Sequence, residues 1–279
     1  MNNSVEKATF NLPTLPEKDF IHFKHFIYEV SGIHLSDAKR SLVAGRLSGR
    51  LRTLQLSSYA EYFAFATSKK NIDERTYLID ALTTNETYFF REPEHFAFLS
   101  KLLQEHKSKS SWRIWSGASS SGEEIYTIAM VMADELGFDG DWNITGTDLN
   151  TKVLKMATAG HYPLERNQGI SKTQLQRYCL KGIDSQQGTF LIDPALRRHT
   201  QFSQQNLIEN CSRLGLFDVI FLRNVMIYFD TASKQKVLNN VLRQLKLGGY
   251  FIISHTESLM NTQHPLTQVG PSIYRKTAV

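Results

Sequence analysis

Cysteine is scarce in this sequence of 279 residues, with Cys179 and Cys211 as the only two. They do not form a C-x-x-C pair, and neither lies in a local cluster with any of the nine histidines. Disulfide-stabilised secreted domains need several cysteines, and structural zinc sites need cysteines and histidines at short, fixed spacings. The sequence therefore predicts neither a disulfide framework nor a metal site.

Long apolar runs are also missing. No stretch approaches the roughly 18 apolar residues of a membrane-spanning helix. The first ten residues, MNNSVEKATF, lack the apolar core of a signal peptide, so we expect a cytoplasmic protein. The hydrophobic content of 41% is enough for one large domain or two unequal ones. The net charge of +5 favours an acidic partner, which the charge alone does not identify as nucleic acid, membrane or protein.

The stretch WSGASSSGEEIYTIAM contains parts of two phosphate-binding motifs and completes neither. Gly117 and Gly122 stand where G-x-G-x-x-G has its first and third glycines, but Ser119 fills the middle position, where a glycine lets the backbone approach a pyrophosphate. Glu123 and Glu124 replace the lysine and hydroxyl of a P-loop. Because two carboxylates repel phosphate, this turn indicates a ligand without phosphate groups.

The chain has two parts with different patterns. Between residues 17 and 83 the apolar residues recur at helical spacing, which predicts short amphipathic helices and no strand. From Trp112 onward, short apolar strands alternate with helices, which predicts a doubly wound α/β sheet with Rossmann-like architecture. The expected strands cover residues 112–116, 142–148, 217–222 and 250–254, and the expected helices 123–136, 151–159 and 232–245.

We therefore expect an N-terminal all-α domain over residues 1–85 and an α/β domain over residues 86–279. The stretch from about 168 to 202 breaks the alternation of strands and helices. Its segment GTFLID and the glycines Gly182 and Gly188 predict a hairpin in a small β-subdomain inserted in the sheet.

In a doubly wound sheet the ligand binds outside the carboxyl ends of the strands. Asp148 ends the second expected strand, where an acidic side chain binds ribose hydroxyls in dinucleotide folds. Alternatively, Asp148 or Asn150 caps the following helix. Asn206 and Asn224 follow two further apolar segments, and their amides suit either an adenine edge or a tight turn.

Taken together, these features favour a ligand with a ribose, a purine, no phosphate and a positive charge. S-adenosylmethionine meets all four conditions, since its sulfonium and ammonium groups are cationic. The simpler explanation of Glu123 and Glu124 is that acidic side chains in the first turn of a helix offset the helix dipole by about 0.3 to 1 kcal/mol. For either glutamate alone, the two interpretations weigh about equally.

Six ordered motifs give the chain a family resemblance. TTNETYFFRE, WSGASSSGEEIYTIAM, GTDLN, QNL, LRNVMIYFD and LGGYFIISHTESL resemble the successive motifs of the chemotaxis receptor methyltransferase family, CheR. The resemblance implies a protein-glutamate O-methyltransferase that uses S-adenosylmethionine and releases S-adenosylhomocysteine. It also implies methyl-accepting chemotaxis receptors as partners, recruitment to receptor arrays, and no nucleic-acid partner or membrane insertion.

The resemblance also implies roles for particular residues. Where the family has cysteine or alanine and then proline, this chain has Ser119 and Ile125, and both changes look tolerable. Arg91 and Tyr228 are implied to be catalytic, although Tyr228 is otherwise explained as a half-buried aromatic residue. The implied cofactor contacts are Asn85, Thr87, Arg91, Glu124 or Glu123, Asp148, Asn206, Leu207, Asn224 and Val225.

The expected second helix, residues 36–54, is basic. It carries one acidic residue, Asp37, against Lys39, Arg40, Arg46, Arg50 and Arg52. A run of charge is usually only a solvated face, but the family resemblance implies that Lys39, Arg46, Arg50 and Arg52 contact the acidic methylation helix of a receptor. The inserted subdomain is similar in length to the one with which some family members bind a pentapeptide at the receptor's carboxyl terminus.

Two rival functions are compatible with parts of this pattern. A nucleic-acid methyltransferase would also place a basic helix beside a methyl donor, but the sequence has no N-P-P-Y-type motif. A cofactor-sensing receptor adaptor without catalytic activity would keep the fold, but Arg91, Asp148 and Tyr228 are all present.

Overall fold

The computed structural model describes residues 14–278, so the polar start of the chain, from which we expect no signal peptide, lies outside the described residues. These residues form two compact units, one helical (14–30 and 34–83) and one α/β (31–33 and 84–278). Among the helices of the described residues, none has the length and apolar character that crossing a membrane requires.

The helical unit consists of short helices around an apolar core, as the sequence predicts. Its core side chains recur at helical spacing and include Phe23, Leu47 and Leu78, which are fully buried. The second expected helix begins differently, because Asp37–Lys39 form a 3-10 turn before it. The helices are α1 (Glu17–Ser31), α2 (Arg40–Thr53), α3 (Tyr59–Thr67) and α4 (Ile72–Leu82).

A seven-stranded sheet forms the centre of the α/β unit, which confirms the predicted fold class. Its first five strands are parallel, the sixth pairs antiparallel with the fifth, and the seventh pairs antiparallel with the sixth. The sequence pattern did not predict the antiparallel pair, because its strands are short and half-exposed. In spatial order the strands are β6 (Thr200–Gln204), β2 (Trp142–Asp148), β1 (Trp112–Gly117), β7 (Phe217–Leu222), β8 (Leu245–Ile252), β10 (Ile273–Lys276) and β9 (Leu266–Gly270).

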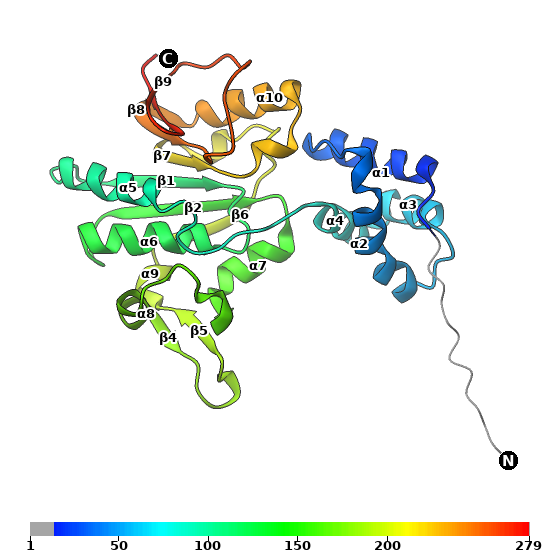
Figure 1. The fold of residues 1–279 in the computed structure, drawn as a ribbon, viewed down its shortest axis with the longest axis horizontal. Helices are drawn as coiled ribbons and strands as arrows, with labels where there is room; N and C mark the ends of the chain where they lie inside the picture. The colour runs from blue at the N-terminus through cyan, green and yellow to red at the C-terminus, as the bar shows by residue number, and fades with distance from the viewer. Residues whose placement is uncertain (1–13, 279) are drawn as a thin grey trace. The chain divides into compact units, whose positions relative to one another are not determined.

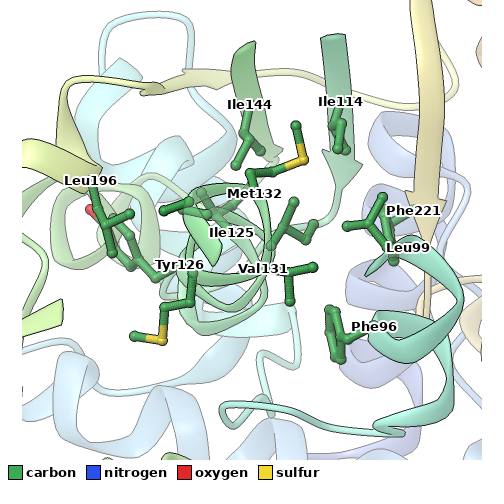
Figure 2. Packing of buried hydrophobic residues seen from close by; sticks show 14 of the residues in the cluster. Phe96, Leu99, Ile114, Ile125, Tyr126, Val131, Met132, Ile144, Leu196 and Phe221 are labelled. Atoms are coloured by element: carbon green, nitrogen blue, oxygen red, sulfur yellow. The ribbon is translucent and has the colours of Figure 1, made fainter. Parts of the chain in front are cut away.

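Helices cover both faces of this sheet (Figure 1). Along β7, Val219 and Phe221 pack into the core beneath α5 (Glu94–Glu105) and α6 (Glu123–Leu136), whereas Ile220 and Leu222 pack against α10 (Thr231–Leu242). Figure 2 shows the first of these cores, in which Phe96 and Leu99 of α5 lie beside Phe221 of β7 and side chains of α6 lie below Ile114 and Ile144. Alternate side chains of a strand point to opposite faces, so an apolar strand such as β7 serves two cores.

A small antiparallel sheet in the order β3-β5-β4 forms the predicted β-subdomain. Its bounds differ from the expected 168–202, because the first strand already begins at His161 and residues 200–204 belong to the large sheet as β6. Neither β3 nor β6 shows a clear apolar alternation, since HYP is only three residues long and TQFSQ is an edge strand whose side chains are half-buried or exposed. The strands are β3 (His161–Pro163), β4 (Cys179–Lys181) and β5 (Thr189–Ile192).

Candidate active site

The site residues predicted from strand ends meet at one edge of the large sheet. Strands β6, β2, β1 and β7 are adjacent and parallel, so the segments that follow them leave the sheet on the same side. Gly117, the last residue of β1, shows how closely these ends pack. A Cβ atom on Gly117 would lie 2.9 Å from the Leu222 side chain and 3.6 Å from that of Leu207.

The turn between β1 and α6 has an unusual backbone. Ala118 and Ser120 adopt positive φ angles of 58° and 49°, and Gly122 has a φ of 98°. Residues with a side chain rarely adopt this conformation, and where they do it often marks a binding site. The hydroxyl of Ser119 is buried and has no hydrogen-bond partner among residues 14–278.

Asp148 connects the end of β2 to this turn. One carboxylate oxygen accepts a hydrogen bond from the Ser120 backbone N–H at 2.9 Å, and the other accepts one from the Asn150 N–H at 2.8 Å. Helix α7 (Thr151–Ala159) is capped by the side chain of Asn150, which accepts hydrogen bonds from the N–H groups of Lys152 and Val153. Of the two alternatives for the cap, the structure therefore selects Asn150.

Glu123, the first residue of α6, faces the small subdomain. Its side chain is fully buried and accepts a hydrogen bond from the Ser121 hydroxyl at 2.7 Å, and a carboxylate oxygen lies 3.1 Å from the Arg166 guanidinium. Burial raises the pKa of Glu123 above its ordinary value, although Ser121 and Arg166 act in the opposite direction. This geometry gives Glu123 a structural role within the α/β unit.

Glu124 faces the sheet instead. Its carboxylate accepts a hydrogen bond from Ser116 on β1 at 2.7 Å and from Arg223, directly after β7, at 2.7 Å. The side chain keeps 13% of its surface exposed. Of the two glutamates, only Glu124 is therefore accessible from outside.

The segment between Thr84 and Glu92 runs beside the same turn. The Asn85 carbonyl accepts a hydrogen bond from the Ser120 hydroxyl at 3.2 Å. The Arg91 guanidinium lies 5.5 Å from the centre of the Tyr88 ring and donates to the Glu86 carbonyl at 3.1 Å. Asn85, Thr87 and Arg91 are all half-buried, so each keeps a surface that a ligand can reach.

Arg223 is a site residue to which the sequence analysis assigned no role. Its buried guanidinium binds Glu124, lies 3.0 Å from the Glu92 carboxylate and donates to the Arg91 carbonyl. Hydrogen bonds from Ser254 and Arg223 outweigh burial and hold the pKa of Glu92 below its ordinary value. The available signal was a charged residue directly after the apolar strand FDVIFL.

Glu257 was also missed, and it orders the segment after β7. Its carboxylate accepts backbone hydrogen bonds from Asn224 at 2.9 Å and Met226 at 2.8 Å. Asn224 has a positive φ of 57° and donates from its side chain to Ser254 at 2.8 Å. These bonds arrange Val225 and the short 3-10 helix Met226–Tyr228, in which Tyr228 is half-buried.

Asn206 adopts the turn that the sequence analysis considered as its alternative role. Its side-chain oxygen accepts from the Ile208 N–H at 3.3 Å, and its amide donates to Glu209 at 3.2 Å. Leu207 is buried, with 7% of its surface exposed. Both residues follow β6 at the edge of the sheet that carries Asp148.

Within the helical unit, two of the basic residues of α2 have internal partners. Arg46 donates to the Thr83 carbonyl at 2.9 Å, at the end of α4. The Arg50 guanidinium pairs with the buried carboxylate of Glu74, with a shortest nitrogen–oxygen distance of 2.5 Å. Lys39, Arg40 and Arg52 are exposed. Fewer basic side chains are therefore directed to solvent than the sequence indicated.

Two family models match the chain. The all-alpha domain of the CheR methyltransferases matches residues 18–83, and their S-adenosylmethionine-binding domain matches residues 85–274. The chain belongs to the CheR methyltransferase family. The family resemblance noted in the sequence and the S-adenosylmethionine cofactor are thereby confirmed.

Curated relatives extend this match over nearly the whole chain. The chemotaxis protein methyltransferase of Salmonella typhimurium is 37% identical over 262 residues, 93% of this chain and 90% of that protein. Chemotaxis protein methyltransferase 2 of Pseudomonas aeruginosa is 39% identical over 263 residues, 92% of each chain. The Escherichia coli chemotaxis protein methyltransferase is 37% identical over 264 residues, 93% of this chain and 91% of that protein.

The site of this CheR family member fits S-adenosylmethionine chemically. The turn lacks the glycine and lysine that phosphates need, and its buried Ser119 hydroxyl has no partner in the described chain. A carboxylate, Asp148, stands at the end of β2, where ribose hydroxyls bind in related sheets. The edge of the sheet thus suits a nucleoside that carries no phosphate.

Proposed function

We propose that this protein methylates glutamate side chains on the cytoplasmic helices of chemotaxis receptors, giving glutamate methyl esters and S-adenosylhomocysteine. The observation that carries the proposal is its similarity to chemotaxis protein methyltransferases over 90% or more of both chains. The protein would act in the cytoplasm and be recruited to receptor arrays. In this proposal residues 1–85 recognise the receptor and residues 86–279 carry out catalysis.

The proposed reaction makes modest demands on the protein. S-adenosylmethionine supplies a methyl group activated by a sulfonium ion. A glutamate carboxylate is ionised at pH 7 and is already a nucleophile, so it needs no general base. What the protein contributes is alignment of the reacting groups and exclusion of water, which is worth about 7 to 11 kcal/mol in favourable cases.

Arg91 and Tyr228 are the proposed catalytic residues. The Arg91 guanidinium is held by the Glu86 carbonyl and the Tyr88 ring, so its planar group is oriented before a ligand arrives. It would bind a carboxylate, either that of the cofactor or that of the substrate. Tyr228 would orient the reacting carboxylate through its hydroxyl, from a segment that Glu257 holds in place.

The remaining proposed contacts hold the cofactor. Asp148, at the end of β2, would accept hydrogen bonds from the ribose hydroxyls. Glu124, which is partly exposed and faces the sheet, is the better candidate for the cationic end than the buried Glu123. The other proposed contacts are Asn85, Thr87, Asn206, Leu207, Asn224 and Val225.

For the receptor, the exposed basic residues of the helical unit are the proposed contacts. Lys39 and Arg52 present their charges to solvent and suit an acidic helix. Arg46 and Arg50 were assigned the same role from the sequence, but their guanidinium groups already bind the end of α4 and Glu74. Their proposed contribution is to hold α2 in position.

The small subdomain is a proposed tether for a receptor carboxyl-terminal pentapeptide. Strand β4 lies at the edge of its sheet, and Leu180 and Ile183 expose 48% and 71% of their surface. An edge strand can pair with an extended peptide through its backbone, while exposed apolar side chains select the sequence. Calorimetry with such a pentapeptide should give a saturable heat of binding. If no heat is measured at high peptide concentration, the proposed tether is wrong.

One labelling experiment tests the function against its two rivals. The protein is incubated with tritiated S-adenosylmethionine and either receptor-containing membranes or nucleic acid. Base-labile label in receptor protein is expected, because methyl esters hydrolyse in base. Label in nucleic acid would instead support a nucleic-acid methyltransferase, and binding of cofactor without any transfer would support a non-catalytic adaptor.

A further inference from the structure

His95 is a fully buried histidine with an unsatisfied ring nitrogen. Its Nδ1 has no hydrogen-bond partner in the part of the chain that the structure describes, and it lies 3.4 Å from Oε2 of Glu92. Its other nitrogen, Nε2, lies 2.9 Å from the Ser272 hydroxyl. Leaving a buried polar atom without a partner costs roughly 1 to 3 kcal/mol, so this nitrogen calls for an explanation.

A second histidine shares the same hydroxyl. His255 Nδ1 lies 2.8 Å from Ser272 Oγ, and His255 Nε2 lies 3.6 Å from a carboxylate oxygen of Glu94. Ser272 adopts a positive φ of 55°, a strained conformation for serine. Ser272 therefore stands between two imidazoles, each of which has its other nitrogen directed toward a glutamate.

The single hydroxyl hydrogen of Ser272 limits how two neutral histidines can be protonated. If His95 donates to Ser272, the bare Nδ1 lone pair of His95 faces the carboxylate of Glu92. If His255 donates instead, its bare Nε2 lone pair faces Glu94. Either arrangement places an imidazole lone pair against a carboxylate, and a cation between them would remove the repulsion.

We propose that Glu92, His95 and His255 bind one divalent transition-metal ion of the Zn²⁺ type. The potential ligand atoms of the three residues all lie within 4.8 Å of one another. Two ligands of a tetrahedral zinc ion, each about 2.0 to 2.1 Å from the metal, stand about 3.4 Å apart. His95 Nδ1 and Glu92 Oε2 already have this separation.

The surroundings of the cluster meet two further requirements of a metal site. A metal ion on Nδ1 would leave the proton of His95 on Nε2, which would then donate to the Ser272 hydroxyl 2.9 Å away, and metal-bound histidines usually make such a second hydrogen bond. His255 is 38% exposed and, with Ser272, lines a pocket of about 600 Å³ that gives an ion access. The exposed Glu94 or a water molecule can occupy the fourth position.

Arg223 is the main electrostatic objection, because its guanidinium lies 3.0 Å from the same oxygen of Glu92. The ion pairs of this region, however, include three carboxylates, those of Glu92, Glu94 and Glu124, against this one guanidinium. The same oxygen of Glu92 accepts from Arg223 and, more weakly at 3.4 Å, from the His255 backbone N–H, so a metal would replace the weaker of these two bonds. The local charge thus favours a dication.

The test uses the full-length protein freed of metal with a chelator, and ZnCl₂ or CoCl₂ as the probe. Calorimetry should show one ion per chain, Co²⁺ should develop the visible absorption of a tetrahedral complex, and Zn²⁺ should raise the thermal midpoint. His255→Ala should weaken Zn²⁺ binding at least about tenfold, and Glu92→Gln should do the same.

His264→Ala is the matched control, because His264 lines the same pocket but lies outside the cluster. It should bind Zn²⁺ as the wild type does. Binding of S-adenosylhomocysteine checks that each variant is folded. Absence of one-to-one binding, an unchanged affinity in His255→Ala, or an equal loss in His264→Ala would overturn the proposed ligand set.

Discussion

The guanidinium of Arg223 lies 2.7 Å from the carboxylate of Glu124, and only 2% of the Arg223 side chain is exposed. The same group also reaches Glu92 and the Arg91 carbonyl. Arg223 therefore joins the end of β7 to the start of α6 and to the segment that carries Arg91. The arrangement of the candidate site depends on one buried cation.

Arg223→Met should lower the free energy of unfolding by about 3 to 5 kcal/mol, because Glu124 and Glu92 would keep their charges without a buried partner. Urea denaturation followed by circular dichroism measures the change. Arg198→Ala is the control, since Arg198 and Asp139 form an exposed pair that is worth at most about 1 kcal/mol. Equal losses in the two variants would contradict the role of Arg223.

Asp148→Asn should weaken S-adenosylhomocysteine binding at least about tenfold, because the variant loses the charge that strengthens hydrogen bonds from ribose hydroxyls. Asn150→Ala removes the cap of α7 and should cost about 1 kcal/mol of stability with little change in affinity. Calorimetry and urea denaturation separate the two effects. Wild-type affinity in Asp148→Asn would show that the ribose binds elsewhere.

Reversing the charges of Lys39 and Arg52 to glutamate should reduce kcat/KM for receptor methylation about tenfold or more, because the exposed attraction for an acidic helix becomes repulsion. The loss should shrink as salt is added, since ions screen both effects. Affinity for S-adenosylhomocysteine should not change. Normal methylation of receptor at low salt would mean that the receptor docks elsewhere.

Arg50→Glu should behave differently from these surface variants. It places a second carboxylate beside Glu74, which is 6% exposed, so the helical unit should lose about 3 to 5 kcal/mol of stability. Thermal denaturation of Arg50→Glu beside Arg52→Glu makes the comparison. If both retain wild-type stability, the ion pair with Glu74 contributes nothing and Arg50 is available to the receptor.

The contribution of Glu123 to the free energy of unfolding should become less favourable as the pH rises. Its folded-state pKa is raised by burial above the ordinary value of 4.5, so the folded state holds this proton more tightly than the unfolded state. The associated destabilisation develops as pH rises from 4.5 through the folded-state pKa. The free energy of unfolding of Glu123→Gln, measured by urea denaturation, should therefore rise relative to that of the wild type across this pH window. If the two proteins show parallel dependence of this free energy on pH, the assignment to Glu123 is wrong.

Both thiols should be unreactive in the native protein. Burial raises the pKa of Cys179 to about 12 and that of Cys211 to about 11, so almost no thiolate is present at pH 8. Ellman's reagent at pH 8 should react slowly with the folded chain and rapidly with two thiols per chain in denaturant. A rapid reaction before unfolding would show that the half-buried Cys179 or the buried Cys211 is accessible to the reagent.

Local sequence patterns determined the fold class. Strand β7 is a short, continuous apolar run, as expected for a strand buried on both faces, and α6 is a longer apolar run that begins at a glycine turn, so local sequence is enough to identify each. The carboxyl ends of parallel strands necessarily share one edge, so the sequence pattern alone places Gly117, Asp148 and Asn224 at the same edge of the sheet.

Tertiary packing alone decided what each charged side chain binds. Glu123 and Glu124 are neighbours in sequence, yet one pairs with Arg166 and the other with Arg223, because successive helical residues point about 100° apart. The sequence places Arg50 on a basic helix face, but in the folded chain its guanidinium pairs with the carboxylate of Glu74. His95 and His255 belong to distant segments, and only the fold brings them to the same serine hydroxyl. Ion pairs form between side chains that are close in space, and the local repeat of apolar residues in a sequence does not show which distant residues will be neighbours.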